Sequence, residues 1–236
     1  LSQKQAQELI DKLKRLSSKH FHENVSTVCS MKDLRYTDGK QQVLYNLDLI
    51  NKAINLGKKI SFTYNVYDTH LQPTFKRKGY VYVVSPYQII FHNEHYYLLC
   101  NFDKYSDIAH LRIDKMNQLN VMDEKVKNKK QIPELRDGFN LSKHIAEHVY
   151  MYGGESVRAT IKCSQSLIDE LVDWFGKCFR IVNYKDGEVT IRVKCNEQSL
   201  FYWALQYGTC AEVIEPKELR SRIREAVEGM SRKYAE

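Results

Sequence analysis

The stretch GYVYVVSPYQIIFHNEHYYLLCNFDKYSDIAHLRIDKM, residues 79–116, decides the fold of this chain. Apolar and polar residues alternate within it over short runs, which is typical of β-strands. Asn93-Glu94 is short enough to be a tight hairpin turn. With the alternating run before it, the stretch predicts five strands, at residues 59–65, 80–85, 87–92, 95–101 and 108–114. Strands this short and closely spaced are typical of a small SH3-like or Sm-like barrel.

Basic and aromatic side chains share one surface of the predicted barrel. In its last strand the period of two places His110, Arg112 and Asp114 opposite the apolar residues. A guanidinium can hold a phosphate with two parallel hydrogen bonds, and an imidazole can add a donor. The alternative is an ordinary solvated face, because charged side chains are mostly exposed. The pattern suits an anionic or nucleic-acid ligand better than catalysis.

Helical patterns precede the barrel. Ser2 and Gln5 form a capping box, and apolar residues at helical spacing then predict a helix to about Lys19. A second helix is predicted from Asn46 to Gly57, where a glycine is well placed to end it. We therefore assign residues 1–57 to a helical linker segment and residues 58–122 to the barrel.

A second domain follows a linker at residues 123–154, which carries one short helix from Leu141 to about Val149. Residues 155–236 predict the order β-α-β-β-α-β-α, with a hairpin at Asp186-Gly187 and Pro216 at the start of the last helix. This order matches a ferredoxin-like unit with an added helix. The expected fold class is α+β, a small barrel followed by a ferredoxin-like C-terminal domain.

Composition limits the class of protein. The net charge of +7 permits an anionic partner without requiring one, and 43% hydrophobic with 28% charged residues is ordinary for a soluble globular protein. No apolar run approaches the roughly 20 residues that span a bilayer. The six cysteines form no C-x-x-C pair and lack metal-ligand spacing. We therefore expect reduced thiols in a cytoplasmic protein without membrane contact.

Residues 59–116 resemble the WYL domain of bacterial transcriptional regulators. The signature tripeptide is Tyr96-Tyr97-Leu98 here, with Tyr in place of Trp, between Ser85-Pro86-Tyr87 and the run His110–Lys115. Lys115 stands where Arg is common; it keeps the charge but loses the bidentate fork. Residues 151–236 resemble the extension that commonly follows this domain. The first helix resembles the segment that joins it to an N-terminal winged helix-turn-helix, which is missing from this chain.

The resemblance implies the ligand-sensing part of a DNA-binding regulator, normally a homodimer, whose barrel binds an anionic effector. In some members the ligand is single-stranded nucleic acid. The second hypothesis is therefore a direct single-stranded nucleic-acid binding module, for example an accessory to a nucleic-acid defence system. Duplex DNA would be bound through the absent N-terminal domain, and no cofactor is expected. The expected ligand-binding residues are Arg112, His110, Tyr97, Ser85, Tyr87, Tyr64, Lys76 and Arg77.

Two of these assignments keep a structural alternative. Tyr96 and Tyr97 lie on opposite faces of their strand, so at most one of them lines a given pocket, and we expect Tyr97 to be the surface member. Lys76 and Arg77 lie on a long hairpin loop, which is either a flexible clamp for the ligand or only a mobile basic loop.

One short motif points toward catalysis. The run from His144 to His148 fits the H-x-x-E-H pattern of zinc peptidases. A five-residue pattern often arises by chance, and the two histidines lack a credible third ligand. No Walker loop, G-x-G-x-x-G or G-x-S-x-G motif is present. We therefore expect no enzyme activity, no catalytic residues and no bound metal.

Overall fold

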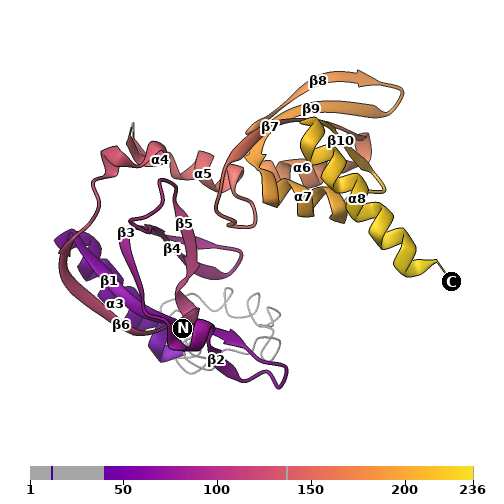
Figure 1. Ribbon diagram of the computed structural model, residues 1–236. Coiled ribbons are helices and arrows are strands. Elements are labelled where there is room, and N and C mark those ends of the chain that lie inside the picture. The colour runs from indigo at the N-terminus through magenta and orange to yellow at the C-terminus, as the bar shows by residue number, and fades with distance from the viewer. Residues whose placement is uncertain (1–11, 13–39, 137, 236) are drawn as a thin grey trace. The chain divides into compact units, whose positions relative to one another are not determined.

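The computed structural model describes residue 12 and residues 40–136 and 138–235 of the chain (Figure 1). The predicted helix from Ser2 to Lys19 lies outside the described residues, apart from that single position. The chain forms two compact units. The N-terminal unit contains the described residues up to Leu98 together with Arg112–Val126, and the C-terminal unit contains Leu99–Leu111 and the residues from Lys127 onward.

Helix α3 (Lys40–Leu56) opens the N-terminal unit. Ile50 and Ala53 are fully buried, as expected for the apolar face of an amphipathic helix. Asn46 is also buried, and its side-chain amide donates a 2.9 Å hydrogen bond to the carbonyl oxygen of Met116. Gly57 follows the helix with a φ of 62°, a left-handed conformation that glycine adopts readily. The predicted end of this helix is confirmed, while its start lies six residues earlier than predicted, at Lys40 instead of Asn46.

In the N-terminal sheet β1 pairs antiparallel with β2, β3 and β6, and the sheet curls through register shifts. β1 pairs with β6 at Ile60↔Val121 and Tyr64↔Met116, with two irregularities along this ladder. Such bulges bend a strand and increase its twist. The strand order is β2-β1-β3-β4-β5, and β6 pairs with β1. The elements are β1 (Lys58–Tyr67), β2 (Pro73–Phe75), η1 (Lys76–Gly79), β3 (Tyr82–His92), β4 (His95–Asn101), β5 (Ala109–Arg112), η2 (Ile113–Lys115) and β6 (Met116–Lys125).

Two strand predictions need correction. The predicted strands at 80–85 and 87–92 form one continuous strand, β3, which passes through Pro86. Within β3, the residues that pair with β1 are Tyr82–Val84, so the missing N–H of Pro86 lies beyond this ladder. Strand β6 was not predicted at all, because only Met116 and Leu119 of its mostly polar residues are buried. The prediction of a small SH3-like or Sm-like barrel is confirmed in the form of a curled antiparallel sheet.

The C-terminal unit contains a four-stranded sheet in the order β10-β7-β9-β8. Its element order matches the predicted β-α-β-β-α-β-α unit, which confirms the α+β fold class. Trp203, Phe175 and Ile191 are fully buried in its core. The elements are η3 (Lys129–Gln131), α4 (Pro133–Arg136), α5 (Leu141–Glu147), β7 (Ser156–Ser164), η4 (Gln165–Leu167), α6 (Ile168–Phe175), β8 (Phe179–Lys185), β9 (Glu188–Asn196), α7 (Glu197–Gln206), β10 (Ala211–Glu215) and α8 (Lys217–Tyr234).

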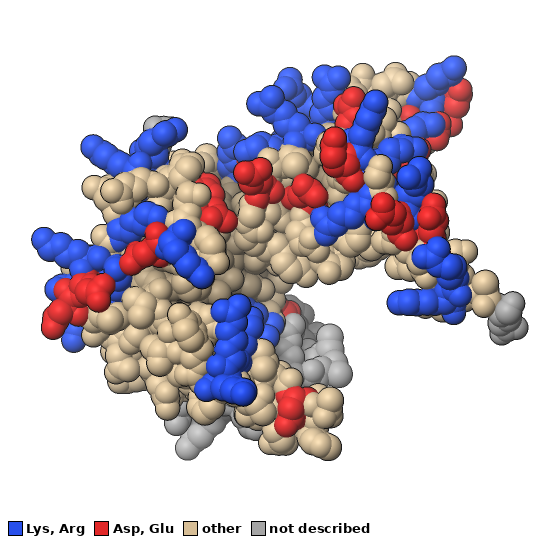
Figure 2. Space-filling view, viewed as in Figure 1, with Lys and Arg blue, Asp and Glu red and all other residues tan. Residues whose placement is uncertain are grey.

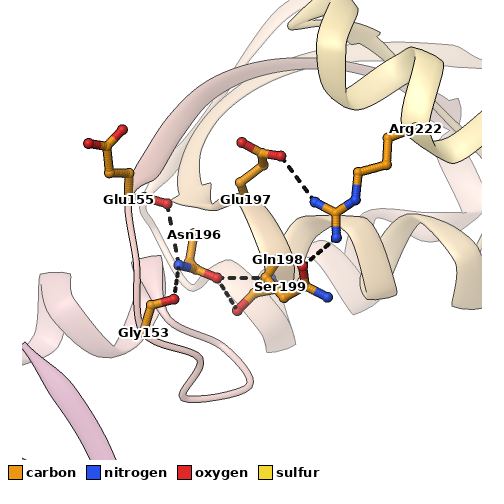
Figure 3. Close-up of polar contacts among 7 residues, drawn as sticks. All are labelled: Gly153, Glu155, Asn196, Glu197, Gln198, Ser199 and Arg222. Atoms are coloured by element: carbon orange, nitrogen blue, oxygen red, sulfur yellow. Dashed lines mark hydrogen bonds and ion pairs between the residues drawn. The ribbon is translucent and has the colours of Figure 1, made fainter.

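Asn196 joins two segments of this unit through its side chain (Figure 3). Its side-chain oxygen accepts a 3.0 Å hydrogen bond from the N–H of Ser199 and so caps α7. Its side-chain nitrogen donates to the carbonyl oxygens of Gly153 and Glu155, at 3.2 and 3.3 Å. One amide therefore joins the start of α7 to the segment that leads into β7. Within the part of the chain that the structure describes, no helix has the length and apolar character needed to cross a membrane.

Candidate functional site

A group of polar side chains in the N-terminal unit centres on Tyr64 of β1 and Arg112 at the end of β5. The phenolic oxygen of Tyr64 accepts a 3.1 Å hydrogen bond from the backbone N–H of Arg112. Burial raises the pKa of Tyr64 to about 12, so its hydroxyl is neutral at pH 7. Because the oxygen already accepts, the hydroxyl proton is left to donate, and the described residues provide no acceptor for it. Tyr64 therefore offers a neutral hydrogen-bond donor beside a guanidinium.

Arg112 is held by Asp114. Its Nε and Nη2 atoms donate to the two carboxylate oxygens at 3.1 and 2.6 Å, a bidentate fork. This hydrogen bond raises the pKa of Arg112. Burial acts to raise the pKa of Asp114, but the hydrogen bond and charge of Arg112 outweigh it and hold that pKa below its ordinary value. Within the described residues Nη1 of Arg112 has no acceptor, so part of the guanidinium is available to a ligand.

Two lysines increase the positive charge. Burial, followed by the charge of Arg112, lowers the pKa of Lys115, and the charge of Lys76 contributes to the same shift. The ammonium nitrogen of Lys76 lies 5.7 Å from the ring centroid of Tyr64, within cation–π range. Lys76 and Arg112 therefore lie beside Tyr64, and Lys115 lies near Arg112, so that three cations face the carboxylate of Asp114 among the described residues. We call Tyr64, Lys76, Arg112, Asp114 and Lys115 the Tyr64 site.

β4 borders the Tyr64 site with His95 and Tyr97. These residues lie two positions apart and so share a face of the strand, and their rings meet edge to face at 6.4 Å. The charge of His95 helps to lower the pKa of Asp114. The charge of Tyr97 contributes to raising the pKa values of Tyr64 and Arg112. Tyr96 lies on the other face, where it is 38% exposed and contacts Phe91. The expectation that Tyr97 is the surface member is therefore wrong, because Tyr96 is exposed and Tyr97 is half-buried; Tyr97 is nevertheless the tyrosine of the pair that borders the site.

The basic loop beside the site is strained. Arg77 and Lys78 have φ values of 50° and 55°, a left-handed conformation that L-residues other than glycine, asparagine and aspartate rarely adopt. Both side chains are exposed. Consecutive strained residues persist only where the surrounding structure holds them, and such positions cluster at ligand sites. The loop thus presents Arg77 and Lys78 to solvent directly after Lys76.

The ligand-binding residues predicted from the sequence do not all lie at one site. Tyr64, Lys76, Tyr97 and Arg112 come together, and Arg77 is exposed on the adjoining loop. Ser85 and Tyr87 are buried in the N-terminal unit, on a part of β3 in which four consecutive residues, 84–87, are buried. The sequence-based set omitted three residues of this region, Asp114, Lys115 and His95. The alternation that selected Arg112 also points to Asp114, and the spacing of two from Tyr97 points to His95.

His110 belongs to the C-terminal unit and has different neighbours. Its Nε2 atom lies 2.7 Å from Nε2 of His144. The rings of His144 and His148 stack with centroids 4.3 Å apart, and Nδ1 of His148 lies 2.9 Å from the carbonyl oxygen of Tyr152. Burial, then the nearby histidines, lower the pKa of His110 to about 2. Burial and His148 lower the pKa of His144 to about 3. Both of these imidazoles are therefore neutral at pH 7.

The geometry of this histidine cluster is that of a hydrogen bond. Two nitrogens that bind one zinc ion tetrahedrally lie roughly 3.3 Å apart, farther than the 2.7 Å between His110 and His144. No group of three or more His, Cys, Asp or Glu among the described residues is placed to hold a metal ion. His110 is the third histidine of this cluster, but its nitrogen lies too close to that of His144 for the two to bind one zinc ion. The absence of zinc stays a prediction for elemental analysis.

Comparison with known proteins gives the class of the two units. The sequence matches the family model of the WYL domain over residues 45–121 and that of the WCX domain over residues 155–231. The chain is therefore a WYL-domain protein with a C-terminal WCX domain, as the tripeptide Tyr96-Tyr97-Leu98 and its flanking motifs indicated. Curated protein sequences contain no significant match to the chain. The Tyr64 site lies within the matched WYL domain.

Solved structures resemble the chain in fold. One is the proteasome accessory factor B/C (PafBC) of Arthrobacter aurescens, with 15% identity and a TM-score of 0.36 over 85% of this chain. Another is described as a CRISPR Cas-related protein, with 16% identity and a TM-score of 0.50 over 84% of this chain. The chain spans only 28% and 56% of the lengths of these two proteins. At 16% identity the likeness to the second protein concerns the fold alone, and the TM-score of 0.36 for the first supports no conclusion.

Proposed function

We propose that this chain is the effector-sensing part of a bacterial transcriptional regulator and that its effector is an anion bound at the Tyr64 site. One observation carries the proposal. The hydroxyl proton of Tyr64 and Nη1 of Arg112 have no acceptor among the described residues, and they lie beside the ammonium groups of Lys76 and Lys115. Donors without acceptors, grouped around a net positive charge, fit an oxyanion.

The bound anion would take a defined set of contacts. One oxygen accepts from the hydroxyl of Tyr64 and another from Nη1 of Arg112, while the lysines neutralise the remaining charge. Hydrogen bonds to charged groups contribute about 1.5–3 kcal/mol each. The fork to Asp114 limits this gain, because it occupies the two nitrogens that a bidentate phosphate contact uses. Either the anion binds end-on at Nη1, or it displaces the carboxylate.

A second candidate is direct binding of single-stranded nucleic acid, as an accessory to a nucleic-acid defence system. The basic loop favours it, because Arg77 and Lys78 extend the positive charge of Lys76 away from Tyr64. Tyr97 and His95 add rings on which a base can stack. A strand of several nucleotides would reach both the Tyr64 site and the loop, whereas a small effector needs only the site. The description of one structural neighbour as CRISPR Cas-related agrees with this candidate.

We further propose that the chain acts by binding and not by catalysis. The histidines of the H-x-x-E-H motif hydrogen-bond with His110 and with the carbonyl oxygen of Tyr152, which accounts for them structurally. By the family resemblance, the full protein is expected to be a cytoplasmic homodimer that binds duplex DNA through a winged helix-turn-helix. Binding of the effector at the Tyr64 site would then change DNA binding by that domain.

Arg112→Ala tests the proposal. The probes are thymidine 5′-monophosphate and a 5′-phosphorylated pentathymidylate, titrated by isothermal calorimetry in low salt. Arg112→Ala is expected to weaken binding by about 1.5–3 kcal/mol, roughly 10- to 150-fold, with an unchanged circular dichroism spectrum. Lys125→Ala is the matched control, because it removes an exposed charge of the same sign from β6 of the same unit. This control should leave the affinity within twofold.

The outcomes separate the two candidates. If wild type and Arg112→Ala bind both probes equally, the Tyr64 site is not an anion site and the proposal is wrong. If the pentanucleotide binds no better than the mononucleotide, the small-effector function stands and the nucleic-acid candidate is contradicted. If it binds more tightly and Lys76→Ala/Arg77→Ala/Lys78→Ala abolishes the difference, the nucleic-acid candidate is favoured.

A further inference from the structure

The sheet of the C-terminal unit has one face outside the hydrophobic core. Ala159, Ile161 and Cys163 of β7 are buried with the helices α6 and α7, as are the odd-numbered residues of β9. Because side chains alternate along a strand, the even-numbered residues point to the opposite side. We call this side the open face. Figure 2 shows lysine and arginine side chains projecting from the region of β8 and β9, with acidic side chains beside them.

Three arginines are adjacent on the open face. Arg180 of β8 lies directly opposite Arg192 of β9, and Arg158 of β7 lies directly opposite Lys194. Arg158 and Arg192 are then diagonal neighbours, since Arg192 is two residues from the partner of Arg158. Arg158, Arg180 and Arg192 are exposed. They form one continuous basic patch across three neighbouring strands, which we call the arginine patch.

The arginine patch is not neutralised by the part of the chain that the structure describes. Among the described residues no ion pair involves Arg158, Arg180 or Arg192, whereas Lys194 pairs with Glu147 at 2.9 Å and Lys162 with Glu188 at 2.7 Å. The remaining acids of this face lie on the β10 edge, where Glu212 pairs with Arg220 and Glu215 accepts a hydrogen bond from Thr160. Like charges directly opposite each other destabilise a sheet. The patch therefore lowers the stability of the fold, and a bound partner of opposite charge would remove this repulsion.

Uncharged donors lie beside the arginines. Asn183 of β8 is directly opposite Thr190 of β9, on the same face as Arg180 and Arg192. Arginine together with threonine and asparagine is the set of side chains that proteins use for phosphate oxygens. None of the residues 158, 160, 162, 180, 183, 190, 192 and 194 is aromatic, so this face offers no ring on which bases can stack.

We propose that the arginine patch is a docking surface for the phosphate backbone of a single-stranded nucleic acid, separate from the Tyr64 site. Neighbouring strands lie about 4.8 Å apart, so the three arginines span roughly 10 Å across the sheet. A flexible single strand adjusts its phosphates to a patch of this size, one phosphate to each guanidinium. Since the contacts are to the backbone, binding is independent of base sequence and depends steeply on salt.

The test uses the whole chain and a fluorescently labelled 15-nucleotide oligothymidylate, followed by anisotropy between 50 and 200 mM NaCl. The variant is Arg158→Gln/Arg180→Gln/Arg192→Gln. The control is Arg224→Gln/Arg232→Gln/Lys233→Gln, which removes the same charge from the exposed part of α8. Both are measured in the Arg112→Ala background, so that binding at the Tyr64 site does not contribute. Circular dichroism confirms that each variant is folded.

We expect the patch variant to bind at least tenfold more weakly at 50 mM NaCl, with a salt slope lower by about 2, or 0.7 for each of three phosphates. The control variant should bind within twofold of its parent. Equal losses in both variants would show a response to net charge alone and would overturn the proposal, as would no loss in either. A 15-base-pair duplex that loses as much affinity, or an oligoglutamate that competes as well as the oligonucleotide, would contradict the single-stranded partner.

Discussion

Replacing Asp114 by asparagine tests how the Tyr64 site is controlled. The carboxylate of Asp114 occupies two of the nitrogens of Arg112, at 3.1 and 2.6 Å, and is the single negative charge among the residues of the site. The Asp114→Asn substitution keeps the size of the side chain but removes that charge. The fork loses its charge assistance, and the guanidinium becomes available for bidentate contact with an anion. We therefore expect tighter anion binding.

The magnitude follows from distance and exposure. An anion at Nη1 of Arg112 would lie about 5 Å from the Asp114 carboxylate, and two like charges at that distance repel by roughly 1–2 kcal/mol at an effective dielectric constant of 40–80. The upper part of this range requires low solvent exposure, and the two side chains are 30% and 27% exposed. An increase in affinity of about 1 kcal/mol, roughly fivefold, is the value to expect.

The assay is calorimetric titration with thymidine 5′-monophosphate at 50 mM NaCl, for wild type, Asp114→Asn and the control Asp123→Asn. Asp123 is exposed at the end of β6 in the same unit, so its replacement raises the net charge equally. A gain in Asp114→Asn that the control lacks supports competition for Arg112. Weaker binding in Asp114→Asn would refute the reasoning, because it would mean that the carboxylate orients Arg112 for the ligand.

Three further predictions concern stability. The folded-state pKa of His110, about 2, lies below its ordinary value of 6.5. The stabilisation by the neutral imidazole is therefore fully present above pH 6.5 and is lost as the pH falls toward 2. Between pH 7 and pH 5 the free energy of urea unfolding should fall by about 2 kcal/mol more in wild type than in His110→Phe. Arg77→Gly should raise the unfolding free energy by about 1 kcal/mol, because glycine adopts a φ of 50° without strain, and no gain in urea unfolding would contradict this. Arg192→Thr removes the like charge opposite Arg180 and should raise the melting temperature by an amount equivalent to about 0.2–1 kcal/mol, whereas Lys233→Thr should not.

Local patterns predicted the C-terminal unit closely because β7, β9 and β10 each have one buried and one exposed face. Ala159, Ile161 and Cys163 alternate with polar residues, and Asp186-Gly187 supplies the turn between β8 and β9. In the N-terminal unit the same rule failed at residues 84–87, where both faces of β3 are buried and alternation disappears. Pro86 then looked like the end of a strand, although the strand continues beyond the part that pairs with β1.

The pairing of β6 with β1 joins segments more than 50 residues apart in the sequence, as in Ile60↔Val121. β6 has the sequence MNQLNVMDEK, in which polar residues dominate and only two positions are buried. A strand of this kind is specified by the hydrogen-bonding groups of its partner more than by its own side chains. Its own period therefore offered no reason to expect it. The predicted barrel lacked β6 and also β2, whose three residues lie in the predicted hairpin loop.

The different surroundings of Arg112 and His110 show what the two-residue period of a β-strand does not predict. Both were assigned to one strand face, and a period of two determines only the side of the sheet to which a side chain points. It does not determine what covers that side. His110 meets His144 and His148, which lie more than 30 residues further along the chain, and these rings leave it buried and neutral. Arg112 meets Asp114, which is close enough in sequence to have been included with it. The partners of a polar side chain could thus be predicted where they are local, and long-range packing decided the rest.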